Sequence, residues 1–396
     1  MTGRDYLKIW YRVQISATLL VLLAMLVRNF NLGREYVVST LYGPVIILAI
    51  GVAVELIPGL PDIVHRLNAW LQGLTQPLIL VFFWDVITRE IITLLQLPSR
   101  GVVSLMIIYY VLMFAPFASV IGGQLSLSIE RFIFVFSTVQ VVFTPLIALP
   151  RDLVDNRTLL LALSTGAVGA LAYFIMISTS MRAWRLSWPG LKPHFSGDFN
   201  WLILLFFVVL FFAMTYLNAG AIAPNHLGSK KELLTAFEAG VAEETLFRFA
   251  ILGVLFYAWR NIKQRLPLAI ITSSILFGLV HLINAAQQEL GVTVFQAVAA
   301  AGIGLFFAMI YVYTGQLWLV ILMHGYFDWT SFIVSGATSM TEAHIGLAPW
   351  IAVLCEVAVF VLILVWMLLG QRRVVMERHV ARLTGTKQHF DYQIRY

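Results

Sequence analysis

Long apolar runs, separated by short polar connections, dominate the chain. A helix that crosses a bilayer needs about 20 mostly apolar residues, and this pattern predicts an all-α, polytopic transmembrane helical bundle with about 11–12 spans. The candidate spans cover residues 14–27, 41–60, 72–92, 102–121, 132–149, 159–178, 200–217, 232–258, 267–285, 294–313, 316–334 and 349–369. The third also holds Asp85, Arg89 and Glu90, so it could instead be an amphipathic helix at the membrane interface.

Composition supports a membrane protein. Of the 396 residues, 60% are hydrophobic and only 12% are charged, whereas soluble domains carry about 25% charged residues. The net charge of +6 is then best explained by basic connections on the cytoplasmic side. We therefore expect the lipid bilayer as a partner and no nucleic acid.

The distribution of basic residues predicts the orientation. Arg4, Lys8 and Arg12 precede the first apolar run as in a signal peptide, but no small-x-small cleavage site follows, so we expect an uncleaved span. With the N-terminus inside, about 17 of the 26 lysines and arginines fall in inner connections and about 8 in outer ones. This predicts a multi-pass protein of a cell membrane with both termini cytoplasmic.

A polar, basic stretch with two prolines, "MRAWRLSWPGLKPHFSGDFN", divides the chain near residue 190. We predict an accessory transmembrane region over 1–190, a second transmembrane domain over 191–370, and a basic cytoplasmic tail over 371–396. The single cysteine, Cys355, excludes an internal disulfide and is interpreted as a small lipid-facing or packed residue.

The second domain carries ionisable residues inside three separate apolar segments. They are Glu243, Glu244 and Arg248 in the first segment, His281 in the second, and His324 and Asp328 in the third. A charge at bilayer depth costs several kcal/mol unless it is paired or faces a wet cavity. Each residue alone has a structural explanation, but together they would place unneeded charge on three neighbouring helices. We therefore predict one shared site.

Two adjacent carboxylates in segment 232–258 have different surroundings. Glu244 and Arg248 are four residues apart and share a helix face, which predicts a buried ion pair. Glu243 points about 100° away and is left without this partner. Such an arrangement can give one fixed carboxylate and one poised base. Glu238, one turn or so earlier on the same helix, is interpreted as a vestibule residue or a loop-side charge.

The two histidine segments each allow more than one interpretation. A lone histidine such as His281 is usually a packed residue, and Phe277, one turn earlier, is interpreted as a packing residue that shapes the site. His324 and Asp328 share a face. The aspartate could fix the tautomer of the histidine, both could bind a metal, or the aspartate could orient a histidine that stabilises an oxyanion.

In this order, the motifs "EETLFR", "FGLVH" and "HGYFD" resemble the CPBP family of intramembrane proteases, also called the CAAX-protease and bacteriocin-processing or Abi family. The family pattern is E-E-x-x-x-R, F-x-x-x-H and H-x-x-x-N or H-x-x-x-D on successive transmembrane helices. The resemblance covers about residues 200–335. It implies an α-helical membrane endopeptidase that cleaves a membrane protein or peptide. Eukaryotic relatives remove three residues from prenylated CAAX proteins, and prokaryotic relatives are linked to peptide maturation, bacteriocin immunity and regulated proteolysis.

The resemblance also implies roles for individual residues. Glu243 would be the general base that activates water, with Glu244 and His281 beside it, and Arg248 would hold the carboxylates in place. His324 and Asp328 would stabilise the oxyanion or complete the site. An ionised aspartate cannot donate a hydrogen bond to an oxyanion, as the asparagine of other members can. Asp328 therefore suits metal binding or orientation of the histidine better.

Metal dependence stays open at this stage. The H-E-x-x-H zinc signature is absent. Two histidines and a carboxylate on separate helices could still hold a catalytic divalent metal such as zinc, with ligands drawn from Glu243, His281, His324 and Asp328. The alternative is a metal-free pair of glutamate and histidine.

Two functions of other classes compete with the peptidase. Buried glutamates and histidines also serve proton-coupled transporters, for which about twelve spans is a common size. Against a transporter, the chain shows no inverted repeat and its charged cluster is confined to one region. A non-catalytic membrane regulator with the same fold is the third hypothesis, and the complete motif set argues against it.

Overall fold

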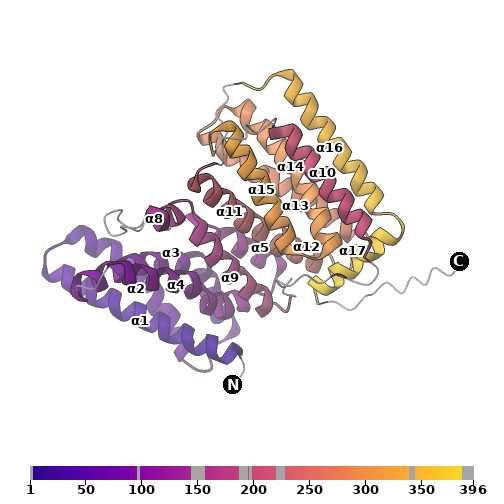
Figure 1. Ribbon diagram of the computed structural model, residues 1–396. Coiled ribbons are helices and arrows are strands. Elements are labelled where there is room, and N and C mark those ends of the chain that lie inside the picture. Colours follow the sequence, from indigo (N-terminus) through magenta and orange to yellow (C-terminus); the bar gives the residue numbers. More distant parts are fainter. Residues whose placement is uncertain are drawn as a thin grey trace. The chain divides into compact units, whose positions relative to one another are not determined.

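The computed structural model of the chain is shown in Figure 1 and describes residues 3–95, 99–143, 157–186, 195, 199–219, 228–338 and 344–385. Every regular element within these residues is a helix, which confirms the all-α prediction. The chain forms two compact units, Met1–Trp184 (unit 1) and Arg185–Tyr396 (unit 2). The predicted division near residue 190 lies outside the described residues.

Unit 1 is built from long apolar helices. They are α1 (Gly3–Asn31), α2 (Glu35–Leu56), α3 (Asp62–Leu95), α4 (Ser99–Phe117), the π-helix η1 (Ala118–Gly122), α5 (Ser128–Ser137), α6 (Gln140–Phe143), α8 (Arg157–Ser164) and α9 (Ala167–Ala183). Trp84 and Tyr110 are fully buried and meet edge to face, and the Trp84 indole donates to the carbonyl of Met106. This contact joins α3 to α4.

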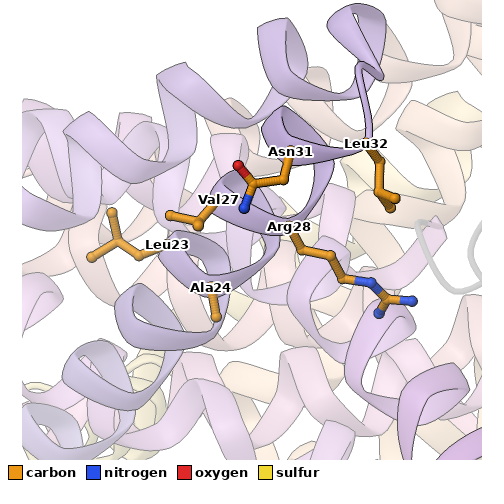
Figure 2. Close-up of a pocket in the computed structure, with 6 residues that line it drawn as sticks. All are labelled: Leu23, Ala24, Val27, Arg28, Asn31 and Leu32. Carbon is orange, nitrogen blue, oxygen red and sulfur yellow. The ribbon is translucent and has the colours of Figure 1, made fainter.

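A shallow pocket lies along the last turns of α1 (Figure 2). Its lining residues are Leu23, Ala24, Val27, Arg28, Asn31 and Leu32. Arg28 pairs with Glu90 at 3.4 Å, and both side chains are exposed. None of the ionisable residues singled out from the sequence lines this pocket.

Unit 2 contains the segments with buried charge. Its elements are α10 (Trp201–Ala219), α11 (Lys230–Glu244), the π-helix η3 (Thr245–Ile251), α12 (Leu252–Ala258), α13 (Arg265–Val280), the 3₁₀-helix η4 (His281–Ala286), α14 (Leu290–Thr314), α15 (Leu317–Ser335), α16 (Leu347–Met367) and α17 (Gly370–Leu383). A reciprocal capping box starts α11, because Ser229 accepts from the amide of Glu232 and the Glu232 carboxylate accepts from that of Ser229. Left-handed glycines, Gly315 and Gly336, end α14 and α15.

Eight helices of the described residues are long and apolar enough to cross a membrane, and the bent pair α8 and α9 would make a ninth. The difference from twelve has local causes. Segment 200–217 is the shorter apolar helix α10, and segment 232–258 is divided between α11, η3 and α12. Segment 132–149 contains parts of α5 and α6, and its end lies outside the described residues. The doubtful third span does qualify, over Asp62–Thr93.

Glycines allow α11 and α15 to pack at very short range. A Cβ atom on Gly240 would lie 2.8 Å from the carbonyl oxygen of Ile321, and one on Gly325 would lie 3.3 Å from that of Ala236. Small residues permit such close approach of helix backbones in membranes. This contact brings the carboxylates of α11 to the histidine of α15.

The two remaining predictions concern the end of unit 2. Cys355 is exposed on α16. The predicted tail begins within α17, which packs on α14 through Arg382, a donor to the carbonyl of Gly315. Residues 386–396 lie outside the described residues.

Candidate active site

His324 of α15 lies at the centre of the site. Its Nδ1 is 2.8 Å from Oε1 of Glu244, and its Nε2 is 3.5 Å from Asp328 Oδ2 and 3.7 Å from Glu243 Oε2. The side chain is only 6% exposed. Because an ionised carboxylate can only accept, the short contact requires a proton on Nδ1. Three carboxylates therefore surround one imidazole.

The two adjacent glutamates are in opposite environments. The Glu244 side chain is completely buried, whereas that of Glu243 is 35% exposed. Glu244 is held from both sides, by His324 and by Arg248, whose Nε lies 3.1 Å from Glu244 Oε2. In the part of the chain that the structure describes, the only ion-pair contact of Glu243 is the longer one with His324. One carboxylate is thus fixed, and the other is partly accessible.

Arg248 is fully buried in η3 and is stabilised by aromatic rings as well as by charge. Its guanidinium carbon lies 4.7 Å from the centre of the Phe277 ring and 6.0 Å from that of Phe247. The contact with Glu244 is close, but its angles do not make it a hydrogen bond. The ring faces therefore supply part of the stabilisation that a buried cation requires.

Phe277 of α13 touches three of the ionisable residues. Its ring lies under Arg248 and meets the rings of His281 and His324 edge to face, at centroid distances of 5.1 and 5.9 Å. A Cβ atom on Gly304 would lie 2.9 Å from this ring, so the glycine lets α14 approach it closely. This geometry agrees with Phe277 as the residue that shapes the site.

His281 begins η4, directly after α13. Its Nδ1 lies 2.9 Å from the carbonyl oxygen of Phe277. A carbonyl only accepts, so Nδ1 carries the hydrogen, and in this tautomer Nε2 is a hydrogen-bond acceptor. His281 is half-buried and lies within electrostatic range of Glu243. The structure therefore brings together the residues of all three motifs.

The backbone conformation directly after the two glutamates was not expected from the sequence. Thr245–Ile251 forms a fully buried π-helix between the glutamates and α12, and Ser273 donates to the carbonyl of Phe247 within it. Such widened turns are frequent at functional sites. No pattern of residue types marks this turn in advance.

Glu238, interpreted from the sequence as a vestibule residue or a loop-side charge, lies within α11 with only 8% of its surface accessible. Its burial rules out the loop-side charge, and the vestibule residue stays a prediction. Glu238 is within electrostatic range of Glu243, Asp328 and His324. The sequence did contain a signal for this position, because three carboxylates lie within seven residues of one apolar segment. Such clustering indicates a shared role.

A divalent metal at this site stays a prediction. Among the residues that the structure describes, no group of three His, Cys, Asp or Glu side chains is placed to hold one. Nδ1 of His324 is engaged by Glu244, as the second ring nitrogen of a metal-binding histidine commonly is. The steps proposed below use only the side chains of this protein.

Comparisons with known proteins agree with the motifs. Residues 232–330 match a family model described as type II CAAX prenyl endopeptidase Rce1-like. The matched segment spans every ionisable residue of the site, from Glu243 to Asp328, and confirms the resemblance to CPBP and CAAX intramembrane proteases. Neither the curated proteins nor the solved structures gave a match. The family match does not extend into unit 1.

Proposed function

We propose that this protein is an intramembrane endopeptidase, and that residues 232–330, which match the CAAX prenyl endopeptidase model, contain its active site. Its substrate would be a membrane-associated protein or peptide, in which it hydrolyses a peptide bond. The observation that carries the proposal is the pairing of an accessible carboxylate with a fixed histidine. Glu243 is 35% exposed and lies 3.7 Å from His324, while the sealed Glu244 holds the other nitrogen of that ring at 2.8 Å.

Glu243 is the general base in this proposal. It takes one proton from a water molecule, and the resulting hydroxide forms a bond to the carbonyl carbon of the substrate. When the carbon–nitrogen bond breaks, Glu243 returns the proton to the leaving amine. The products are one carboxylic acid and one amine, and the base is regenerated. His281, with Nε2 able to accept, helps to orient the water.

His324 stabilises the negative charge that develops on the carbonyl oxygen. Its ring is surrounded by Glu243, Glu244 and Asp328, so it is positioned as a cationic donor. Asp328 acts through His324 rather than on the oxyanion, since a carboxylate has no hydrogen to donate. Arg248 and Phe277 keep Glu244 in place.

An apolar groove beside the site suits a substrate with an aliphatic group. Its volume is about 510 Å³, and it is lined from α10, α11 and α15 by residues such as Phe211, Phe237, Met323 and Trp329. This supports a lipidated, CAAX-like substrate. We place the protein in a cell membrane with both termini cytoplasmic, on the distribution of lysine and arginine.

A mass-spectrometric survey of new peptide termini in membranes tests the proposal. Cells expressing the wild-type chain are compared at matched level with cells expressing Glu243→Ala. Glu35→Ala, an exposed glutamate in the first turn of α2, is the matched control. We expect termini that occur with wild type and the control and are lost with Glu243→Ala. Identical termini in all three would refute the assignment.

A further inference from the structure

Unit 1 contains several buried amide side chains that take no part in the proposed peptidase mechanism. Asn68, Gln72 and Gln76 of α3 and Gln14 of α1 are each at most 5% exposed. We propose that these four residues, the amide row, bind a file of internal water molecules that enters unit 1 and ends inside it. The inference is independent of the proposed function.

Each amide in the row has a hydrogen-bonding atom without a partner among the residues that the structure describes. Gln14 donates to the carbonyl of Met113 and Gln72 to that of Ile47, but the side-chain oxygen of each is buried and has no partner among the described residues. Gln76 accepts from the Tyr11 hydroxyl, and its nitrogen is left over. Asn68 uses neither of its atoms.

Such a concentration of unsatisfied groups requires an occupant. Nearly all buried polar atoms in folded proteins have a hydrogen-bond partner, and an unpaired one is costly. In an apolar bilayer the surrounding lipid cannot provide it. One unpaired atom could be removed by a small rotation, but five such atoms occur on four buried side chains, three of them on one face of α3.

The row has the geometry of a file. Asn68, Gln72 and Gln76 are spaced four residues apart on one face of α3 and extend over about 12 Å along the helix. At the Gln76 end of the row, the hydroxyl of Tyr11 on α1 donates to Gln76. In the middle of the row, Gln72 donates to the carbonyl of Ile47 on α2. A Cβ atom on Gly51 would lie 2.8 Å from Nε2 of Gln72, so α2 approaches the row closely.

The file is closed at one end. Beyond Gln76 on α3 comes Ile79, which belongs to a buried apolar cluster with Leu22, Leu41, Val45 and Leu48. At the other end, Asn68 lies about 9 Å from the start of α3 at Asp62. Water therefore enters from the Asp62 end and stops at the apolar cluster, so the file is not a channel through the membrane.

The chemistry of the row selects water as the occupant. The unsatisfied atoms include both donors and acceptors, and none of the four side chains is charged. They therefore favour a small neutral molecule that donates and accepts at once, and disfavour an ion or an apolar chain. Internal waters commonly satisfy buried polar groups in this way.

Hydroxyl-radical labelling by X-ray irradiation, with the full chain in lipid nanodiscs, tests this inference. Radicals form from water next to the residue that they modify, and Tyr11 reports on the row. Tyr110 and Tyr173 are matched controls, because all three tyrosines are 0% exposed and each donates a hydrogen bond, to Gln76, Val141 and Val135 respectively.

We expect Tyr11 to be modified about tenfold faster than either control, because only Tyr11 adjoins bound water. Equal rates for the three tyrosines in the wild-type chain would overturn the proposal, and this comparison needs no variant. In a folded Asn68→Leu/Gln72→Leu protein, Tyr11 labelling should fall to the control rate. Unchanged labelling of Tyr11 in that protein would also contradict the amide row as the water site.

Discussion

The two units place polar groups in apolar helices in opposite ways. Unit 2 seals a charged pair completely, since the side chains of Arg248 and Glu244 are both 0% exposed, and sets an accessible carboxylate beside it. In unit 1 the interior amide row is neutral, and the arginine of each ion pair between described residues stays exposed, even where the carboxylate is buried, as in Arg66–Glu130, with side chains 47% and 2% exposed. A charge in an apolar helix therefore indicates a functional site when both it and its partners are buried and it is bonded to a second helix. It says much less about function when its partner is exposed at the surface.

The histidines of unit 2 should give the largest effects. His324→Ala removes one of the two partners of the sealed Glu244, so it should abolish cleavage and lower stability. His281→Ala should lower cleavage by about 10²–10⁴-fold, as expected for loss of a group that assists proton transfer. It should leave stability nearly unchanged, because His281 is half-buried and, within the described ranges, its one hydrogen bond is with the carbonyl of Phe277.

Cleavage rates and unfolding midpoints in detergent would be measured on the same preparations of both variants. If His324→Ala unfolded at the wild-type midpoint, Glu244 could not depend on it for compensation. If His281→Ala cleaved at the wild-type rate, His281 would have no part in orienting the water.

The ion pairs give a graded comparison of stability. Removing one partner of a buried pair leaves an uncompensated charge and costs about 3–5 kcal/mol, so Arg248→Ala should destabilise the protein strongly. Arg28→Ala, which breaks the exposed pair with Glu90, should cost less than about 1 kcal/mol. Chemical unfolding in detergent, followed by tryptophan fluorescence, measures both. If Arg248→Ala and Arg28→Ala lowered the free energy of unfolding equally, the contrast between the two units would be wrong.

The close contact of α11 with α15 should tolerate no added methyl group. Gly240→Ala would place Cβ 2.8 Å from the carbonyl oxygen of Ile321 and should cost about 1–3 kcal/mol, as overpacking does. It should also slow cleavage, because it moves Glu243 away from His324. Gly291→Ala in α14 is the control, since a Cβ atom there meets no neighbour within 4 Å. Thermal midpoints and cleavage rates that are the same for both variants would show that the two helices are not held in contact.

The smallest expected effect is a pH dependence in unit 1. Burial alone would raise the pKa of Glu130 in α5, but hydrogen bonds from the Leu127 amide, Arg66 and Trp70 outweigh it and lower the pKa below its usual range. A lowered pKa stabilises the fold above the usual carboxyl pKa of about 4.3 and loses that contribution as the pH falls through the folded value.

Stability measured between about pH 6 and pH 3 should therefore fall more steeply for the wild-type chain than for Glu130→Gln, which cannot titrate in this range. Parallel curves for the two proteins would show that Glu130 does not contribute in this way.

Local order was predictable from the sequence, and contacts between helices were not. Apolar runs located the helices, and spacings of four residues placed Glu244 beside Arg248 and His324 beside Asp328. These are properties of a single helix, so residue types along the chain are enough to determine them.

The rest depends on how the helices meet. The contact of α11 with α15 is set by Gly240 and Gly325, and it decides that Glu244, rather than Glu243, makes the short bond to His324. The π-helix at Thr245–Ile251 and the burial of Glu238 also follow from packing against neighbouring elements. Helical periodicity predicts neither the π-helix nor the close approach of α11 and α15, and only the clustering of three carboxylates in one apolar segment pointed to the burial of Glu238.

The most direct test of the central claim is the cleavage rate of purified wild-type and Glu243→Gln proteins on the same substrate, in water enriched in oxygen-18. The account predicts that the wild-type protein introduces one oxygen-18 atom into the new carboxyl terminus. It further predicts that Glu243→Gln, folded and equally stable, is slower by about 10²–10⁴-fold. Cleavage by Glu243→Gln at the wild-type rate would contradict Glu243 as the base that activates water.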